Sequence, residues 1–374
     1  MMPLRIGLIG SRGIPANYGG FETFVDKLAV GLKQYENVEI YVVGDPNQKA
    51  AFNGQTEYEG VHLLYSRFDK SAKPNLYFFD SGLKVMKKVD IIFSCGVAGA
   101  FSTWFFRLAG KKYYTNPDGL GWRREKYGKL KSTLLAIMFY VSYKTSSFIV
   151  PDSQEIGNFV QKNFGKRKNI KVIEYGSEVN EFNGVENETT DEILKKFEVR
   201  IGAYHLVVSR LEPENQVHKV VEGYGMSDRK HPLIIIGNLS ENAYIKNLRS
   251  KAEGKNIRFI GGVYNQTELK TLRTNAISYF HGHKVGGTNP SLLEAMASKN
   301  LCVCHDNVFN REVTGGSGLF FKDYEDVDRA LNYIEAEGNE AELTELREGA
   351  FKRIEEHYNW DRIVREYYEL FKSA

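Results

Sequence analysis

The sequence predicts an α/β protein of two doubly wound, parallel-sheet domains that follow one another along its 374 residues. Short apolar, strand-like runs alternate with amphipathic helical stretches in both halves of the chain. A polar, acidic segment at 177–200 interrupts this alternation, and a chain of this length commonly forms two domains. We therefore expect one domain at 1–185, a second at 190–356, and a C-terminal helix at 357–374 that packs back on the first domain.

The first domain begins with a βαβ unit: a strand at 5–9, a glycine-rich loop, a helix at 21–33 and a strand at 38–43. The apolar run at 5–10 ends at glycines, so it is interpreted as a first strand and not as a signal peptide. Runs rich in β-branched and aromatic residues predict the remaining strands of this domain: 61–65, 90–95, 112–116, 147–151 and 170–176. The segment 177–200 is interpreted as a linker followed by a short helix.

The second domain is expected to begin with a strand at 204–210. Its other predicted strands are 232–238, 257–262, 276–282 and 301–306. Parallel sheets bind ligands beyond the carboxyl ends of their strands. Side chains just after strands are therefore the candidates for a functional site, which we expect in one crevice between the two domains.

The overall composition limits the classes of partner. A formal charge of +3, with no Lys/Arg block and no zinc-type spacing, argues against nucleic acid. The three cysteines are an odd number, and Cys302 and Cys304 share one apolar run, which suits a reducing cytoplasm and makes a poor metal site. No run of about 18 apolar residues predicts a membrane-spanning helix.

A glycine-rich loop follows the first strand, in the segment GLIGSRGIPANYGGFETF. The spacing of Gly7, Gly10 and Gly13 suits a nicotinamide-binding turn, with Asp45 after the second strand as the ribose-binding acid. An NAD-dependent oxidoreductase is therefore one alternative. In a dinucleotide fingerprint the third glycine opens the helix directly, whereas residues 14–20 intervene here.

The same loop ends in Gly19 and Gly20, at the start of the helix. Adjacent glycines at this position allow a phosphate or a sugar to approach backbone N–H groups. A merely flexible loop is the simpler alternative. Glu22 lies in the first helical turn, where the helix dipole favours a negative charge even without a ligand.

Asp118 follows the strand at 112–116 and precedes a glycine. Catalytic carboxylates gather at strand ends in such sheets, although Asp-Gly is also a common turn dipeptide. The helix that follows brings basic residues (Arg123, Arg124, Lys126, Lys129, Lys131) beside apolar ones (Leu134, Leu135, Ile137, Met138, Phe139). Such a segment suits an anionic membrane surface, or equally a core helix with a solvated basic start.

Arg210 stands at the end of the first strand of the second domain, in VVSRLEPENQ. A guanidinium at this position can bind a diphosphate with two parallel hydrogen bonds, because its donors match the spacing of phosphate oxygens. Asn215 offers a further, neutral donor. An ordinary surface arginine is the alternative.

Glu294 lies among apolar residues in a helix that should begin at Asn289, an N-cap, with Pro290 in the first helical position. A carboxylate held away from water costs several kcal/mol unless hydrogen-bond donors surround it. If the amides at 286–289 hold a diphosphate, the two hydroxyls of the attached ribose are suitable donors. The alternative is a core glutamate paired with an arginine or lysine elsewhere in the chain.

These segments resemble the retaining glycosyltransferases of family four, which have the GT-B architecture of two Rossmann-like domains facing across a cleft. The resemblance covers nearly the whole chain, through GGFETFVDKLAVGL, SRLEPEN, GGVYNQTELKTL, LLEAMAS, REVTGGSGLFF and YNWDRIV. GSRGIPANYGGFET, NPDGLGW and VGGTNPSLLEAMAS are similar to segments of bacterial rhamnosyltransferases of surface polysaccharide synthesis. That resemblance implies dTDP-L-rhamnose as donor, a lipid-linked saccharide such as GlcNAc-diphosphate-lipid as acceptor, and a peripheral position on the inner face of the cytoplasmic membrane.

The resemblance also implies roles for individual residues, in a transfer that needs no cofactor and no metal. It assigns catalysis to Asp118, Arg210 and Glu294. It places the donor against Gly19, Gly20, Arg210, Asn215, Val263, Tyr264, Gly287, Thr288, Asn289 and Glu294. It places the acceptor against Tyr18, Glu22 and Asp118.

The chain departs from the family pattern at three positions. Gly286 replaces a second glutamate, Asn215 replaces a lysine, and many members have a histidine near the position of Asp118 that contacts the sixth hydroxyl of the donor. A 6-deoxy sugar such as rhamnose has no such hydroxyl, so the last contact would have no function. A non-catalytic subunit that binds sugar nucleotides is the alternative explanation.

Overall fold

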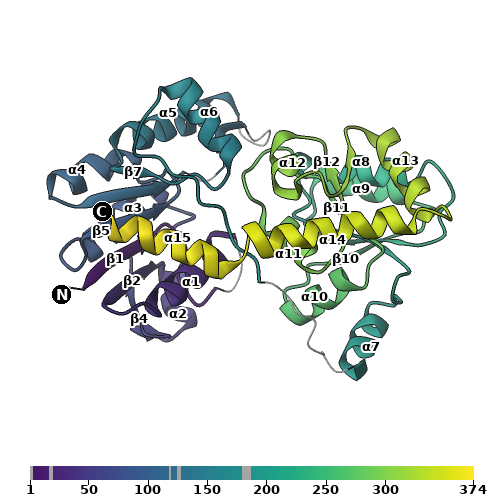
Figure 1. The fold of residues 1–374 in the computed structure, drawn as a ribbon, viewed down its shortest axis with the longest axis horizontal. Coiled ribbons are helices and arrows are strands. Elements are labelled where there is room, and N and C mark those ends of the chain that lie inside the picture. Colours follow the sequence, from purple (N-terminus) through teal and green to yellow (C-terminus); the bar gives the residue numbers. More distant parts are fainter. Residues whose placement is uncertain (1–2, 17–19, 118, 124–127, 179–186) are drawn as a thin grey trace. The chain divides into compact units, whose positions relative to one another are not determined.

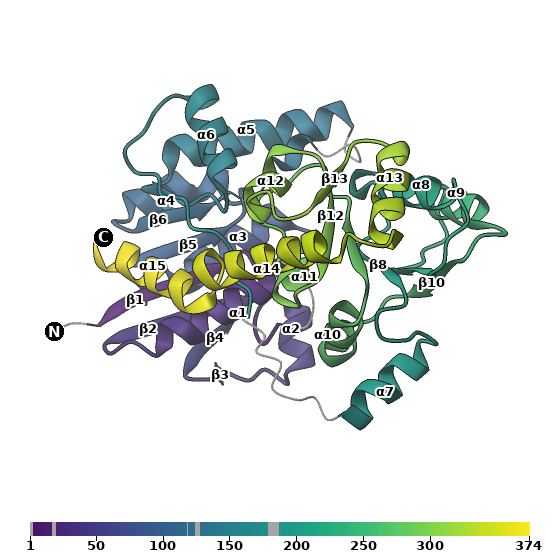
Figure 2. The same cartoon turned by 45° about the vertical axis from the view of Figure 1, so that its right-hand side comes forward.

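The computed structural model describes residues 3–16, 20–117, 119–123, 128–178 and 187–374. The chain divides into two compact units: unit 1 comprises Met1–Gly176 with Trp360–Ala374, and unit 2 comprises Ser177–Asn359. Each unit contains a mainly parallel β-sheet with helices on both faces (Figure 1 and Figure 2). The expected architecture of two doubly wound α/β domains is therefore confirmed.

The first boundary between the units lies earlier in the chain than the sequence suggested. Residues 170–176 belong to unit 1 but do not form the predicted strand: only Ile170 makes a bridge, to Ile149. Gly176 lies against the indole of Trp360, where a Cβ would come within 2.6 Å of Cδ2. This contact ties the end of the segment to the returning C-terminal helix.

Unit 1 has a seven-stranded sheet in the order β3-β4-β2-β1-β5-β6-β7. The strands are β1 Leu4–Ile9, β2 Val38–Gly44, β3 Glu57–Tyr58, β4 Val61–Tyr65, β5 Ile91–Cys95, β6 Lys112–Asn116 and β7 Phe148–Ile149. The short β3, which the sequence did not indicate, runs antiparallel to β4. The strand order reverses beside β1, which pairs with β2 on one side and with β5 on the other.

Helices cover both faces of this sheet. α1 (Gly20–Lys33) packs against α15 (Trp360–Lys372), where Tyr35 stacks on Tyr368 with 3.9 Å between the ring centroids. α3 (Pro74–Met86) and α4 (Thr103–Leu108) contribute Tyr77 and Phe106 to one apolar cluster with the sheet residue Ile92. The remaining helices of unit 1 are α2 Pro46–Ala51, η1 Ala100–Ser102, η2 Gly121–Arg123, α5 Lys129–Thr145 and α6 Gln154–Phe164.

Unit 2 has a six-stranded parallel sheet in the order β10-β9-β8-β11-β12-β13. The strands are β8 His205–Val208, β9 Leu233–Ile236, β10 Ile257–Gly261, β11 Ser278–His281, β12 Leu301–His305 and β13 Leu319–Phe321. Five of them fall within the predicted runs; β13 was not predicted, because its few residues follow a Gly-Gly-Ser-Gly segment. The strand order reverses between β8 and β11, which pair directly.

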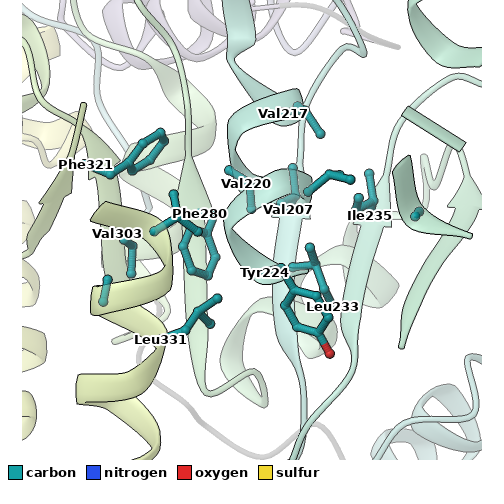
Figure 3. Packing of buried hydrophobic residues seen from close by; sticks show 14 of the residues in the cluster. Val207, Val217, Val220, Tyr224, Leu233, Ile235, Phe280, Val303, Phe321 and Leu331 are labelled. Atoms are coloured by element: carbon teal, nitrogen blue, oxygen red, sulfur yellow. The ribbon is translucent and has the colours of Figure 1, made fainter. Parts of the chain in front are cut away.

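The helices of unit 2 also form two layers. α8 (Val217–Tyr224), α9 (Ala243–Ala252) and α13 (Tyr324–Glu335) share one apolar core with the sheet, which includes Val207, Phe280 and Tyr224 (Figure 3). The other helices of unit 2 are α7 Asn187–Lys196, η3 Pro213–Asn215, α10 Gln266–Thr274, α11 Pro290–Ala297, α12 Val308–Thr314 and α14 Glu340–His357. α14 packs against α11 and β12.

Tyr77 connects the start of unit 1 to the rest of its sheet. Its side chain is fully buried, and its hydroxyl lies 2.5 Å from the carbonyl oxygen of Ser11 and 2.7 Å from that of Val43. Burial raises the pKa of this phenol, which therefore stays a hydrogen-bond donor. One side chain of α3 thus links the loop after β1 to the end of β2.

We predict that Tyr77→Phe lowers the free energy of unfolding of unit 1 by about 1–2 kcal/mol, because a buried carbonyl loses its donor. Chemical denaturation of the two proteins measures the difference. The matched control is Tyr140→Phe. The side chain of Tyr140 is 46% exposed, so removal of its hydroxyl should change the free energy of unfolding little. Equal stability of Tyr77→Phe and the native chain would contradict the proposed link.

Candidate functional site

The glycines after β1 are required by close packing against neighbouring strands. Gly10 and Gly13 have φ of +98° and +124°. A Cβ at Gly10 would lie 2.3 Å from the carbonyl oxygen of Cys95, and one at Gly13 would lie 2.9 Å from the Cα of Gly44. The loop therefore folds tightly over the ends of β5 and β2, which explains its glycine content without a dinucleotide.

Asp45 has a structural role at the end of β2. Its Oδ1 accepts hydrogen bonds from the backbone N–H groups of Asn47 and Gln48, both at 3.0 Å, and so caps α2. The residue is only 1% exposed. A ribose could reach this carboxylate only if the cap opened, so the oxidoreductase alternative loses its ribose-binding acid.

Glu22 is held within unit 1 by two donors that the sequence analysis did not identify. Its carboxylate accepts from the backbone N–H of Arg12 at 3.0 Å and pairs with the Nζ of Lys70 at 3.3 Å. Glu22 is buried, so these partners supply the charge compensation that burial demands. Lys70 comes from the segment after β4 and brings a cation to the loop after β1.

Several predicted site residues of unit 1 fall outside the described part of the chain. These are Tyr18, Gly19 and Asp118, together with Arg124 and Lys126 of the basic segment. Gly20 is described and is the first residue of α1.

In unit 2, Arg210 follows β8 at the point where the strand order reverses. Its side chain is exposed, while its carbonyl oxygen accepts from the backbone N–H of Glu212 at 2.8 Å and from Asn215 Nδ2 at 2.7 Å. Asn215 is 1% exposed. This hydrogen bond holds the loop that carries Arg210 in place. It also uses one N–H of the Asn215 amide group, which is therefore not available to a ligand.

The loop after β11 lies directly beside this one. A Cβ at Gly282 would come within 2.0 Å of the carbonyl oxygen of Asn215, and the N–H of Lys284 donates to the carbonyl oxygen of Glu214 at 3.2 Å. From the other side, the Nδ2 atoms of Asn307 and Asn310 donate to the carbonyl oxygen of His283 at 2.8 and 3.1 Å. The start of the loop that leads to Gly287 and Thr288 is thus held from two sides.

α11 begins where the sequence predicted. Asn289 is its N-cap, with its side chain accepting from the N–H of Ser291 at 3.0 Å, and Pro290 is the first helical residue. The hydroxyl of Ser291 donates to the carbonyl oxygen of Val208 at 3.2 Å. The N-terminus of α11 is therefore attached to the end of β8, close in the chain to Arg210.

Glu294 has a protein partner, Arg273 of α10. The Nη2 atom of Arg273 lies 2.6 Å from Oε2 of Glu294, and the arginine side chain is 5% exposed against 39% for the glutamate. A glutamate paired with an arginine or lysine was the alternative expectation from the sequence, and Arg273 is such a partner. Spacing could not identify it, because it lies on another helix. The exposed part of the carboxylate is still accessible to a ligand.

Val263 and Tyr264 follow β10, the edge strand of this sheet. Val263 is half-buried and Tyr264 is 58% exposed. The two residues lie at the same carboxyl edge as Arg210, but two strands away from β8 in the sheet order.

Histidines that the sequence analysis missed occupy the ends of β11 and β12. His281 stacks on His283 with 4.9 Å between ring centroids, and both His281 and His305 are buried. Burial, reinforced by His305, lowers the pKa of His281 to about 3. Burial, with Lys219 and Lys284 nearby, lowers the pKa of His305 to about 4. Both rings are neutral at physiological pH.

The described residues contain no group of three or more His, Cys, Asp or Glu side chains placed to hold a metal ion. Among the helices that the structure describes, none is both long and apolar enough to cross a bilayer.

Two family models match this chain. Residues 5–178 match one described as Domain of unknown function (DUF1972), and residues 191–353 match one described as Glycosyl transferases group 1. The second match includes Arg210, the loop after β11 and Glu294.

A curated relative and solved structures are similar over almost the full length. An uncharacterized glycosyltransferase, MJ1069, of Methanocaldococcus jannaschii is 24% identical, with 95% of each chain covered. Sucrose-phosphate synthase of Thermosynechococcus elongatus has a TM-score of 0.81 at 14% identity, over 99% of this chain and 98% of that one. Anabaena Alr3699/HepE in complex with UDP has a TM-score of 0.75 at 13% identity, over 99% and 100%. The fold is thus that of GT-B glycosyltransferases, and the part of the chain that matches Glycosyl transferases group 1 is residues 191–353.

The pair of Arg273 and Glu294 makes a prediction about stability. Glu294→Gln should lower the free energy of unfolding of unit 2 by about 1.5–3 kcal/mol, because a buried guanidinium loses its charged partner. The double variant Arg273→Met/Glu294→Gln should recover part of this loss, since no buried charge remains. The control Glu348→Gln, which pairs at 3.3 Å with Lys299 at a half-exposed position, should change stability little. An unaltered stability of Glu294→Gln would show that the pair is not formed.

The buried histidines predict a pH dependence. In the folded protein the pKa values of His281 and His305 are lowered to about 3 and about 4. The stability that comes from burying these neutral rings is therefore fully present above about pH 6.5 and is lost as the pH falls toward these values. Over that pH range, each of the two histidines should lower the free energy of unfolding by about 1.4 kcal/mol per pH unit. Urea unfolding of unit 2 between pH 7 and pH 4 measures the slope. His281→Gln should flatten it, whereas His357→Gln, at an exposed position, should not.

Proposed function

We propose that this chain, whose unit 2 carries the match to Glycosyl transferases group 1, is a retaining glycosyltransferase of family four that transfers L-rhamnose from dTDP-L-rhamnose. The proposed acceptor is a lipid-linked saccharide, such as GlcNAc-diphosphate-lipid, in the synthesis of a cell-surface polysaccharide. The proposed location is the cytoplasm, at the inner face of the cell membrane. No metal or cofactor is part of this proposal.

One observation carries the proposal: Arg210 and the N-terminus of α11 follow adjacent strands at the point where the sheet of unit 2 reverses its strand order. In open α/β sheets this is where ligands bind. An exposed guanidinium and the positive end of a helix dipole together favour a diphosphate. Glu294, one turn into the same helix, is suited to accept hydrogen bonds from the ribose hydroxyls of the nucleotide.

The proposed chemistry balances without an added base. The bond between C1 of the sugar and the leaving phosphate oxygen breaks, and a bond from C1 to the acceptor oxygen forms on the same face. The acceptor hydroxyl gives its proton to the leaving phosphate. The transition state resembles an oxocarbenium ion while negative charge grows on the diphosphate, so Arg210 and the amides at 287–289 would stabilise it. Asp118 is proposed to orient the acceptor or to support the developing cation.

The choice of donor rests on the resemblance of the sequence and on the departures from the family pattern, one of which is Gly286. Alr3699/HepE has been solved with UDP-glucose, so a glucosyl donor is the natural competitor. Gly286 has no heavy atom within 4 Å of a Cβ built on it, so this chain has open space where the family has a glutamate. We propose that these departures accompany a donor without a sixth hydroxyl.

The deciding experiment incubates the purified chain with dTDP-L-rhamnose and a lipid-diphosphate-GlcNAc mimic, and analyses the product by mass and linkage. We expect a rhamnosylated product and a Arg210→Ala variant that is slower by about 10² to 10³. The control is Arg249→Ala, an arginine of unit 2 that is 48% exposed and pairs only loosely with Glu241, at 3.8 Å. Near-normal kinetics of Arg210→Ala would contradict the site.

Other outcomes of the same experiment separate the alternatives. A preference for UDP-glucose would overturn the rhamnose assignment but leave a glycosyltransferase. Tight binding of dTDP with no turnover would indicate the non-catalytic subunit. Fluorescence titration that detects NADH binding but no dTDP binding would favour the oxidoreductase.

A further inference from the structure

One helical layer of unit 1 has an unusually apolar outer surface. Among the described residues of unit 1, all of the large hydrophobic side chains that are exposed lie on α3, η1, α4 or α5. They are Leu76, Phe79, Leu83, Phe101, Trp104, Leu108, Leu130, Leu134, Ile137 and Tyr140. We call this set the α3–α5 surface.

The exposed side chains follow helical spacing, so they form stripes. On α5, Leu130, Leu134 and Ile137 are separated by four and three residues and are 87%, 47% and 48% exposed. The same helix already buries a separate set that includes Met138 and Phe139. The core of unit 1 therefore does not require the outer stripe.

The other two helices repeat this arrangement. Phe101, Trp104 and Leu108 are spaced by three and four residues through η1 and α4, with exposures of 49%, 55% and 80%. Leu76, Phe79 and Leu83 have the same spacing on α3. Each helix thus presents one apolar stripe outward.

The three stripes belong to one continuous layer. The connections β4–α3–β5, β5–α4–β6 and β6–α5–β7 all run in the same direction across the sheet, and right-handed crossovers then place the three helices on one face. The ring centroids of Phe79 on α3 and Phe105 on α4 are 5.6 Å apart. α5 in turn contacts η1 and α4.

The charge of this layer has a single sign at the surface. The exposed ionisable side chains of these helices are all basic: Lys84, Arg107, Lys129, Lys131 and Lys144. The acid in these helices, Asp80, is buried and pairs with Arg67 at 2.7 Å. Apolar stripes that include a tryptophan and have basic residues beside them are typical of a surface that lies in a membrane interface.

We propose that the α3–α5 surface docks on an anionic phospholipid leaflet, with the apolar stripes inserted at the level of the headgroups and the lysines against lipid phosphates. A second copy of this chain fits less well, because a two-fold interface would bring the same cations together. The inference rests on the proposed function only in its choice of a lipid-linked acceptor as the reason for docking. The surface itself is independent of that choice.

The test measures co-sedimentation of the full chain with vesicles. We expect binding to vesicles of equal parts phosphatidylglycerol and phosphatidylcholine, and weak binding to phosphatidylcholine alone. Leu134→Gln/Ile137→Gln should reduce the partition coefficient at least about tenfold, since two apolar side chains no longer insert. Lys129→Gln/Lys131→Gln should also weaken binding and should reduce its sensitivity to salt.

The matched control is Met226→Gln/Val308→Gln, which removes two exposed apolar side chains from unit 2 and should bind vesicles like the native chain. Undiminished binding of Leu134→Gln/Ile137→Gln would overturn the proposal, as would a native chain that stays in the supernatant with both vesicle types. Light scattering that detects a dimer which the same variant dissociates would assign the surface to self-association instead. Turnover of dTDP-L-rhamnose with a water-soluble acceptor mimic is measured in parallel, so that loss of docking and failure of the proposed function are separate results.

Discussion

Parallel strands place all of their carboxyl ends at one edge of a sheet, and the candidate site of unit 2 depends on this constraint. β8 and β11 are far apart in the chain but are neighbours in the sheet, so the loops that follow them must meet. Their contact is close enough that a Cβ at Gly282 would lie 2.0 Å from the carbonyl oxygen of Asn215. Ser291 then ties the start of α11 to Val208. The pairing of β8 with β11, the close contact of their loops and the hydroxyl of Ser291 bring an arginine and a helix N-terminus to one edge before any ligand is considered.

Hydrophobic patterns and capping residues in the sequence were sufficient to predict the features of the fold that short-range interactions determine. Most strands of both sheets, the N-cap at Asn289 and the two α/β units follow from hydrophobic periodicity and capping chemistry, and the structure has them. The segment 170–176 was mistaken for a strand because it is rich in β-branched and aromatic residues. In the structure its apolar side chains, such as Ile173, pack into unit 1 without a complete partner strand.

Tertiary partners could not be predicted in the same way. Nothing in the spacing of Glu294 identifies Arg273, because the two residues lie on different helices and meet only when the sheet has formed. The same applies to Glu22, whose partner Lys70 comes from beyond β4. A carboxylate in an apolar stretch therefore indicates that a partner exists, but the sequence alone does not distinguish a ligand from a distant basic residue. Here Arg273 holds one side of the Glu294 carboxylate, and its exposed part is what a ribose would have to use.

The two units differ in how their less expected residues are explained: a contact within the chain accounts for those of unit 2, but not for those of unit 1. In unit 2, the buried Asn215 donates to the carbonyl oxygen of Arg210, so this neutral side chain fixes the loop that carries the exposed guanidinium. In unit 1, the unexplained residues are apolar and lie on the outside of a helical layer. Leu130 is 87% exposed, which no packing within the described chain accounts for, and exposed apolar stripes on adjacent helices are hard to maintain in water unless something covers them. Because the exposed charges on these helices are all basic, the covering surface should be negatively charged and apolar beneath, and a bilayer has both properties.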